Sequence, residues 1–181
     1  MISTSSEIVS LFIDTIIKTD ATVEKIEASP EALCNSLMKS VRGCENIVIS
    51  EPEFISRNLF ANFQESVNVC NHPNANQLAF ADAGITDAFA GVAQTGSICI
   101  TITSGFSTYV SLLPRKHIVV LDSKNIVERP RDIFNLPISN KSVEQTGWIF
   151  ISGPSATADM GELVKGVHGP DKLHIILLVD K

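Results

Sequence analysis

Apolar residues recur every three or four positions in three stretches of the N-terminal third, and each stretch predicts an amphipathic helix. These stretches are residues 5–18, 30–43 and 51–63. The second has the clearest start, because Ser29 can cap the helix and Pro30 suits its first position. Gly43 would end it. Residues 107–113 show a shorter helical pattern, with Ser107 as the expected cap.

Strands are predicted where apolar residues run together or alternate with polar ones. The continuous runs are residues 46–50, 117–121, 148–151 and 173–179, and the segments 21–28 and 67–70 also suit short strands. Residues 97–103 alternate isoleucine with smaller polar side chains. Helices and strands alternate from residue 46 onward, which predicts an α/β protein with a mostly parallel sheet flanked by helices. We expect a single domain, residues 1–181, with a helical segment before residue 46 and the core after it.

Composition excludes several functions. The chain has 181 residues and a net charge of −6, with no cluster of Lys and Arg, so nucleic-acid binding is not expected. No apolar run approaches the ~20 residues of a membrane-spanning helix, and the N-terminus lacks the basic region of a signal peptide. The four cysteines show no metal or cluster spacing. We therefore expect a cytoplasmic protein without a metal or cofactor of its own.

Two glycine-rich stretches carry the candidate chemistry. They are residues 80–105 and 151–170. In the second, an apolar strand is followed by a glycine turn, and a short helix is predicted to open at Ser155 or Thr157 and to end at Gly166. This arrangement presents free backbone N–H groups to an anion. The alternative is that Gly153 and Pro154 only shape a tight turn.

Open parallel sheets bind ligands at the carboxyl ends of their strands, where both stretches are expected to lie. If their turns converge, hydroxyls and N–H groups would line a small pocket for a carboxylate or phosphate. The expected pocket residues are Thr95, Gly96, Ser97, Ser104, Gly105, Gly153, Pro154, Ser155, Thr157, Asp159, His168 and Gly169. Asp159 and His168 are the candidates for acid–base catalysis, but Asp159 equally suits a helix N-terminus and His168 a turn. His117 and His174 each begin an apolar strand, which indicates structural roles.

The segments ADAGITDAFAGVAQTGS, SLLPRKHIVVL and ISGPSATADMGELVKGVHGP, in this order, resemble the LUD-domain family of lactate-utilisation proteins. The resemblance runs from residue 80 to the C-terminus and is most specific in the last segment. It implies a fold similar to that of sugar-phosphate isomerases and CoA transferases. It also implies an accessory role in the oxidation of L-lactate to pyruvate, alongside partner proteins of which one carries iron–sulfur clusters.

The sequence departs from the family pattern where a ligand would be held. Gln94 stands where the family has an acid, Ala156 where it often has arginine, and Met160-Gly161 where it commonly has Ile-Glu. Loss of an arginine removes a bidentate contact to a carboxylate. Three functions therefore stay open: a lactate-utilisation subunit, an enzyme or sensor that binds a small carboxylate, sugar phosphate or acyl-CoA, and a scaffold with a degenerate site.

Overall fold

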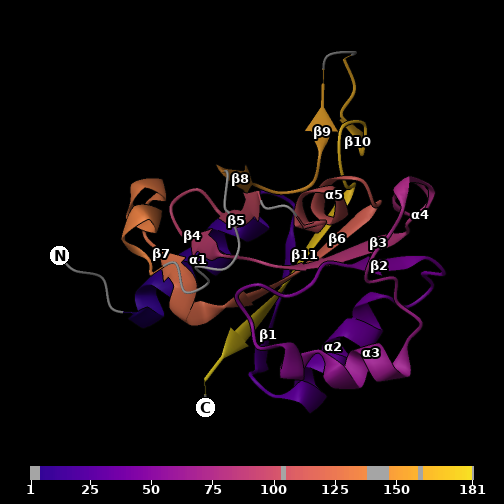
Figure 1. Ribbon diagram of the computed structural model, residues 1–181. Coiled ribbons are helices and arrows are strands. Elements are labelled where there is room, and N and C mark those ends of the chain that lie inside the picture. The colour runs from indigo at the N-terminus through magenta and orange to yellow at the C-terminus, as the bar shows by residue number, and fades with distance from the viewer. Residues whose placement is uncertain (1–4, 103–104, 138–146, 159–160, 181) are drawn as a thin grey trace.

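The computed structural model describes residues 5–102, 105–137, 147–158 and 161–180. At its centre lies a five-stranded sheet in which all neighbouring strands are parallel (Figure 1). Its strands, in spatial order, are β1 (Thr22–Glu27), β11 (Lys172–Val179), β6 (Lys116–Asp122), β3 (Ala83–Asp87) and β2 (Ile47–Ile49). β6 and β11 lie in the interior of the sheet because their apolar runs are buried on both faces. The predicted α/β class is confirmed, and the likeness to isomerases and CoA transferases stays a prediction.

The helices cover both faces of this sheet. They are α1 (Ser5–Ile17), α2 (Pro30–Ser40), α3 (Ala61–Ser66), α4 (Ala75–Ala79) and α5 (Ser107–Leu112). α2 and α3 pack on the face that carries Ile118 and Ile176. α1 packs on the opposite face, against Val119 and Ile175. α4 and α5 cover the β2 end of that second face, where Val48 lies among their side chains.

A second, four-stranded sheet lies on the α1 side of the molecule. Its strands, in spatial order, are β7 (Ile126–Val127), β4 (Ala90–Val92), β5 (Ser97–Ile102) and β8 (Gly147–Ile151). Short 3₁₀ helices complete the described elements; they are η1 (Arg57–Leu59), η2 (Ser123–Asn125) and η3 (Pro130–Asn135). β5 is antiparallel to both β4 and β8. Ile98 and Ile100 of β5 join Phe12 and Ile16 of α1 in one apolar core, which fixes this sheet against the first.

Local signals predicted the first elements well and the middle of the chain less well. Ser29 caps α2, because its Oγ accepts the N–H of Ala32 at 3.2 Å. The helix predicted over residues 51–63 is mostly wrong, since α3 begins only at Ala61. The carboxylate of Asp87 binds the backbone N–H groups of residues 53–55 and holds a loop there. The strand predicted at 67–70 is reduced to one bridge, between Cys70 and Val48. Ser107 is not the cap, because it is the first residue of α5 and Phe106 stands at the N-cap position.

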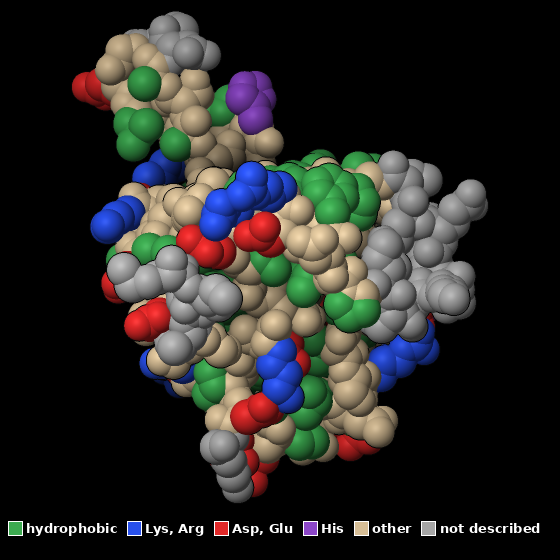
Figure 2. Space-filling model, turned by 90° about the vertical axis from the view of Figure 1, so that its left-hand side faces the viewer, with side chains coloured by type: hydrophobic (Ala, Val, Ile, Leu, Met, Phe, Trp, Pro, Cys, Tyr) green, Lys and Arg blue, Asp and Glu red, His purple; other side chains and the backbone are tan. Residues whose placement is uncertain are grey.

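The helix predicted from Ser155 to Gly166 is wrong. In its place a hairpin of β9 (Ala156–Thr157) and β10 (Val164–Lys165) projects from the body of the protein (Figures 1 and 2). Gly161, in the middle of the predicted helix, has a φ of +96°, which an α-helix does not allow. β8 is a strand as predicted, but it is not buried, since Phe150 is 45% exposed.

Candidate functional site

Two of the predicted turns lie side by side at one end of the second sheet. β5 and β8 are antiparallel with Ile98 opposite Ile151, so the turn before β5 meets the turn after β8. The hydroxyl oxygens of Ser97 and Ser152 are 2.6 Å apart, and Ser97 Oγ donates to Thr95 Oγ1 at 2.7 Å. The structure therefore brings Thr95, Gly96 and Ser97 next to Ser152 and Gly153.

The third turn does not join them. Gly105 follows the other end of β5, where Ile102 pairs with Gly147, so the predicted convergence of all three turns is wrong. Thr157 lies in the projecting hairpin. Ser104 and Asp159 fall outside the described residues, so the candidate acid at 159 stays a prediction.

The two glycines of the adjoining turns let them pack on the end of α1. A Cβ on Gly153, which has a φ of +89°, would lie 2.3 Å from the carbonyl oxygen of Thr19. A Cβ on Gly96, with a φ of +59°, would lie 2.8 Å from the backbone nitrogen of Ile16. Only glycine fits both the backbone conformation and the space. The alternative of glycines that shape a close turn therefore describes these two residues well.

Ser155, His168 and Gly169 come together where the projecting hairpin leaves the body. The N–H of Ser155 donates to Pro170 O at 2.8 Å, and the N–H of Gly166 donates to Ser155 O at 2.9 Å. The N–H of His168 donates to Ser155 Oγ at 3.3 Å. These three N–H groups hold the base of the hairpin, so they are not free to receive the anion that a helix N-terminus would bind.

A cavity of about 250 Å³ lies between this hairpin base, the end of β8 and α5. Gly153, Pro154, Ser155, His168 and Gly169 line it, together with apolar side chains such as Leu112, Ile149 and Leu173. It thus collects five of the predicted site residues from the ISGPS and GVHGP segments. Its volume is just below the ~300–1,000 Å³ of pockets for drug-sized ligands. An apolar lining with a few polar groups is typical of a small-molecule site.

The packing of α5 on β3 completes the cavity. Gly84 of β3 lies directly under α5, and a Cβ there would be 2.1 Å from the carbonyl oxygen of Val110. This close approach brings Ser111 and Leu112 to the cavity beside His117 of β6. The sequence identifies neither Ser111 nor His117 as site residues. The one available signal was a histidine in an otherwise apolar strand.

His117 is the most unusual polar group of the cavity. Its side chain is 1% exposed, and its Nε2 lies 2.9 Å from Thr86 Oγ1. Burial lowers the pKa of His117 to about 3, so the imidazole is neutral at pH 7. Its Nδ1 has no hydrogen-bond partner among the described residues. A buried polar atom without a partner costs about 1–3 kcal/mol, and native proteins contain few of them.

The two aspartates of the first glycine-rich stretch lie elsewhere and hold loops. Asp87 Oδ2 accepts the N–H groups of Glu53, Phe54 and Ile55 at 2.6–2.9 Å. Burial raises the pKa of Asp87 to about 6, while the three N–H donors act in the opposite direction. Asp82 Oδ2 accepts the N–H groups of Glu45 and Asn46, and these bonds lower its pKa.

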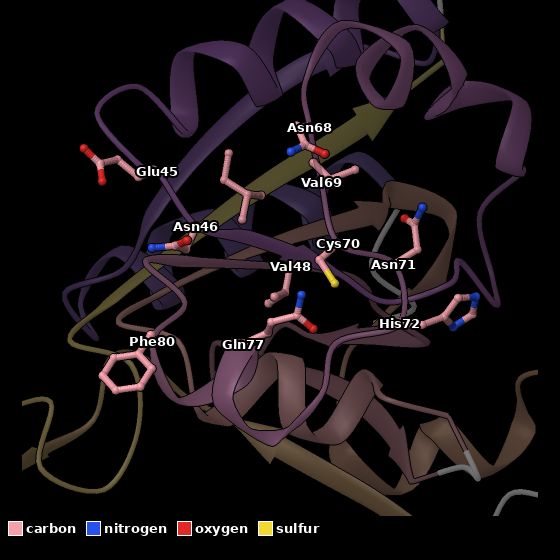
Figure 3. A pocket seen from close by; sticks show the side chains of 11 residues that line it. Glu45, Asn46, Val48, Asn68, Val69, Cys70, Asn71, His72, Gln77 and Phe80 are labelled. Carbon is pink, nitrogen blue, oxygen red and sulfur yellow. The ribbon is translucent and has the colours of Figure 1, made fainter.

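A larger recess, of about 520 Å³, lies at the β2 edge of the parallel sheet (Figure 3). Its polar side chains are mostly neutral amides, and Gln77 of α4 lies across the recess from Asn68. None of the predicted site residues lines it. We therefore take the smaller cavity as the candidate functional site.

Among the described residues, no three His, Cys, Asp or Glu side chains are grouped so that they could hold a metal ion. None of the helices in the described part of the chain has the length and apolar character needed to cross a membrane.

The fold and the cavity define an α/β protein whose parallel sheet supports a small, partly apolar site. A family model described as "LUD domain" matches residues 45–178, so the chain belongs to the LUD domain family. A solved structure described as a DUF162 family protein from Deinococcus radiodurans superimposes with a TM-score of 0.71, covering 98% of this chain and 99% of that one. The two sequences are only 21% identical, so this likeness shows the fold and nothing about the activity.

Several relatives carry the name lactate utilization protein C. That of Halalkalibacterium halodurans is 31% identical over 177 residues, which cover 92% of this chain and 76% of that protein. That of Shouchella clausii is 36% identical over 110 residues, and that of Bacillus subtilis is 34% identical over 105 residues. These two matches cover 58% and 56% of this chain but only 47% and 44% of the relatives' own length.

Proposed function

We propose that this chain is a lactate-utilisation subunit that acts in the cytoplasm in the oxidation of L-lactate to pyruvate. The family match and the names of the relatives support this role. In this proposal electrons pass to iron–sulfur partner proteins, and this chain supplies a binding site. The observation that carries the proposal is the meeting of the ISGPS and GVHGP segments around one cavity, because these are the segments in which the resemblance is most specific.

Growth of a strain that lacks this chain tests the metabolic role. We expect the strain to fail on L-lactate as sole carbon source and to grow normally on pyruvate, because pyruvate enters metabolism after the proposed step. Normal growth on L-lactate would contradict the proposal. Failure on both carbon sources would place the defect outside lactate oxidation and would also contradict it.

Purification of the tagged chain from cells that are growing on L-lactate tests the partner. We expect a second protein to co-purify, together with iron and acid-labile sulfide. The control is the same preparation from cells grown on pyruvate with the chain expressed to the same level. A tagged chain that purifies without iron from lactate-grown cells would contradict the iron–sulfur part of the proposal.

A second candidate function is the sensing or conversion of a small metabolite at the same cavity. It is favoured by the lining of the cavity, in which apolar side chains surround a few polar groups, including Ser155 and His168, because this composition suits a small-molecule site. A thermal-shift screen with small metabolites tests it. We expect at least one of them to raise the melting temperature of the wild type, and no shift with any of them would contradict it.

A further inference from the structure

Two lysines stand directly opposite each other at the amino ends of neighbouring strands. Lys116 is the first residue of β6 and Lys172 the first of β11, and the two are partners in the parallel register (Figure 1). Paired residues of adjacent strands project from the same face of a sheet, which here is the face of Ile118 and Ile176 that α2 covers. Like charges placed opposite each other on two strands are destabilising.

The described part of the protein does not neutralise this pair. Neither lysine forms an ion pair with an Asp or Glu of the described residues. Lys116 Nζ donates to the carbonyl oxygen of Ser40 at 2.6 Å, which uses one of the three N–H groups of the ammonium. Burial lowers the pKa of Lys116; the Cys44 thiol opposes this effect, and the Lys172 ammonium adds to it. An anion beside the two lysines would relieve their repulsion.

A recess of about 320 Å³ lies at this point of the sheet. Both lysines line it, together with Thr22 and His174, whose Oγ1 and Nδ1 atoms are 2.7 Å apart. Burial lowers the pKa of His174, and the Lys116 ammonium lowers it further, so the imidazole is neutral at pH 7. The positive charge of this wall is therefore that of the lysines. The volume lies at the lower end of the ~300–1,000 Å³ range of small-molecule pockets.

The two acidic residues of the lining lie toward the projecting hairpin. Asp20 forms an ion pair with Lys165 of β10. Asp171 packs against the end of the hairpin, since a Cβ on Gly166 would be 3.0 Å from the Cβ of Asp171. The wall that β6 and β11 form is therefore positive, and a negatively charged group would be attracted to it.

We propose that this recess binds a phosphate group, of free phosphate or of a small phosphate ester, beside Lys116 and Lys172. A phosphate group carries about −1.5 to −2 charges at pH 7, enough to neutralise both ammonium groups, and lysine binds phosphate as a point charge. A carboxylate such as lactate carries a single charge, and its flat fork is matched by arginine, which is absent from the described lining.

The inference goes beyond the proposed function and does not depend on it. The recess and the candidate site share Leu173 and no other described lining residue. The anion pocket predicted at the glycine turns has no Lys or Arg among its described lining residues, whereas three lysines line this recess. Growth on L-lactate and phosphate binding can therefore fail independently.

The experiment is a titration with inorganic phosphate, followed by ¹H–¹⁵N NMR, in which chloride is exchanged for phosphate at constant ionic strength. It compares the wild type with Lys172→Gln, which removes the charge and keeps a polar side chain. The matched control is Lys25→Gln, which makes the same change at an exposed position of the neighbouring strand β1 that does not line the recess.

We expect saturable shifts of the amide signals of residues 116 and 172–174 in the wild type. Phosphate should bind Lys25→Gln with the same affinity and Lys172→Gln about tenfold more weakly, because a hydrogen bond to a charged group is lost. L-lactate should bind the wild type about tenfold more weakly than phosphate. No saturable binding, equal weakening in the two variants, or L-lactate as tight as phosphate would overturn the inference.

Glycerol 3-phosphate identifies the source of the phosphate group. If it binds the wild type more tightly than inorganic phosphate does, the recess also receives the organic part of a phosphate ester. If inorganic phosphate binds more tightly, the ligand is the free ion. Both orders support the phosphate site, provided that binding depends on Lys172.

Thermal unfolding in chloride tests the lysine pair without any ligand. Lys172→Gln should melt at the same temperature as the wild type or higher, because the repulsion of Lys116 is removed. Phosphate should then raise the melting temperature of the wild type and Lys25→Gln more than that of Lys172→Gln. A lower melting temperature of Lys172→Gln in chloride would show that the protein itself compensates the charge of Lys172, and would overturn the inference.

Discussion

Thr86 Oγ1 and His117 Nε2 form a buried hydrogen bond of 2.9 Å between the central strands β3 and β6. The bond fixes the ring and occupies one of its two nitrogens. The other nitrogen, Nδ1, has no hydrogen-bond partner among the described residues, and His117 is one of the residues that line the cavity at the base of the projecting hairpin. The His117 side chain therefore belongs both to the core of the parallel sheet and to the lining of the candidate site. Substitutions at Thr86 and His117 should affect both the stability of the protein and binding at the cavity.

His117 should give the protein a measurable loss of stability in acid. Its pKa is about 3 in the folded protein and about 6.5 in the unfolded chain, so the unfolded chain binds a proton first as the pH falls. The stability that His117 contributes is complete above pH 6.5 and decreases from there toward pH 3. Between pH 7 and pH 5 the loss is about 2 kcal/mol.

Urea unfolding at the two pH values measures this effect. The free energy of unfolding of Thr86→Val/His117→Phe should fall about 2 kcal/mol less than that of the wild type between pH 7 and pH 5. Equal decreases in the two proteins would show that His117 is not buried in its neutral form.

Asp87 should be a major source of stability for the loop after β2. Its Oδ2 accepts three backbone N–H groups, and the residue as a whole is 4% exposed. Asp87→Ala leaves these donors without an acceptor and should cost about 3 kcal/mol in urea unfolding at pH 7. The matched control Asp82→Ala removes two such bonds at a half-buried position and should cost about 1 kcal/mol. If the two variants lost the same unfolding free energy, the cost of removing these hydrogen bonds would not depend on burial, which would contradict this account.

Asp87 should change the stability of the protein with pH in the direction opposite to that of His117. Its pKa is raised to about 6 in the folded protein, from 3.8, so the folded state keeps the proton to a higher pH. The stability it contributes is therefore complete below pH 4 and decreases as the pH rises toward 6. Asp87→Asn, which cannot titrate, should lack this decrease when unfolding is measured at pH 4 and pH 6. A parallel decrease in wild type and variant would contradict the raised pKa.

The glycine at position 153 should tolerate no side chain. A Cβ there would lie 2.3 Å from Thr19 O, on a backbone with a φ of +89°. Gly153→Ala should therefore cost about 3 kcal/mol or more. Gly161→Ala is the control, because Gly161 has a φ of +96° but no atom of the other described residues within 4 Å of its Cβ position. Backbone strain alone costs about 1–2 kcal/mol. Thermal unfolding of both variants checks the difference, and similar melting temperatures would contradict the contact with α1.

Cys99 should be the least reactive thiol of the protein. It is fully buried on β5, and burial raises its pKa to about 12, while Cys34, Cys44 and Cys70 are half-buried. Iodoacetamide at pH 8 should modify Cys99 only after unfolding, because the thiolate is the reactive form. Peptide mass mapping of a labelling time course measures this. Native labelling of Cys99 at the rate of Cys70 would show that the second sheet opens readily.

The central sheet could be predicted because its sequence signals are local and strong. The continuous apolar runs of β6 and β11 demand burial on both faces, and Ser29 caps α2 with its own side chain. β3 and β4 gave no such signal, since each begins with Ala-Gly and neither contains a continuous run of large apolar residues. Gly84 is needed there for the close approach of α5, which is a tertiary requirement that no local pattern shows.

The sequence predicted some of the residues that meet at the cavity, and their role as a binding site stays a prediction. The sequence indicated that the ISGPS and GVHGP segments belong together, and Ser155, His168 and Gly169 do line one cavity. The predicted helix at Ser155 was wrong, because the local pattern did not show the pairing of Val164 with Thr157 in a hairpin. His117 was assigned a structural role, since only the packed structure shows that one of its nitrogens has no partner within the described part of the chain.

The most direct test of the proposed role of the cavity is growth on L-lactate of a strain that lacks this chain and carries one of its variants. Wild type and His72→Phe, a change at an exposed turn that does not line the cavity, should restore growth, and Thr86→Val/His117→Phe should not, at equal levels of folded protein. All three strains should grow equally on pyruvate. Full growth on L-lactate with the double variant would contradict a role for the cavity in lactate utilisation.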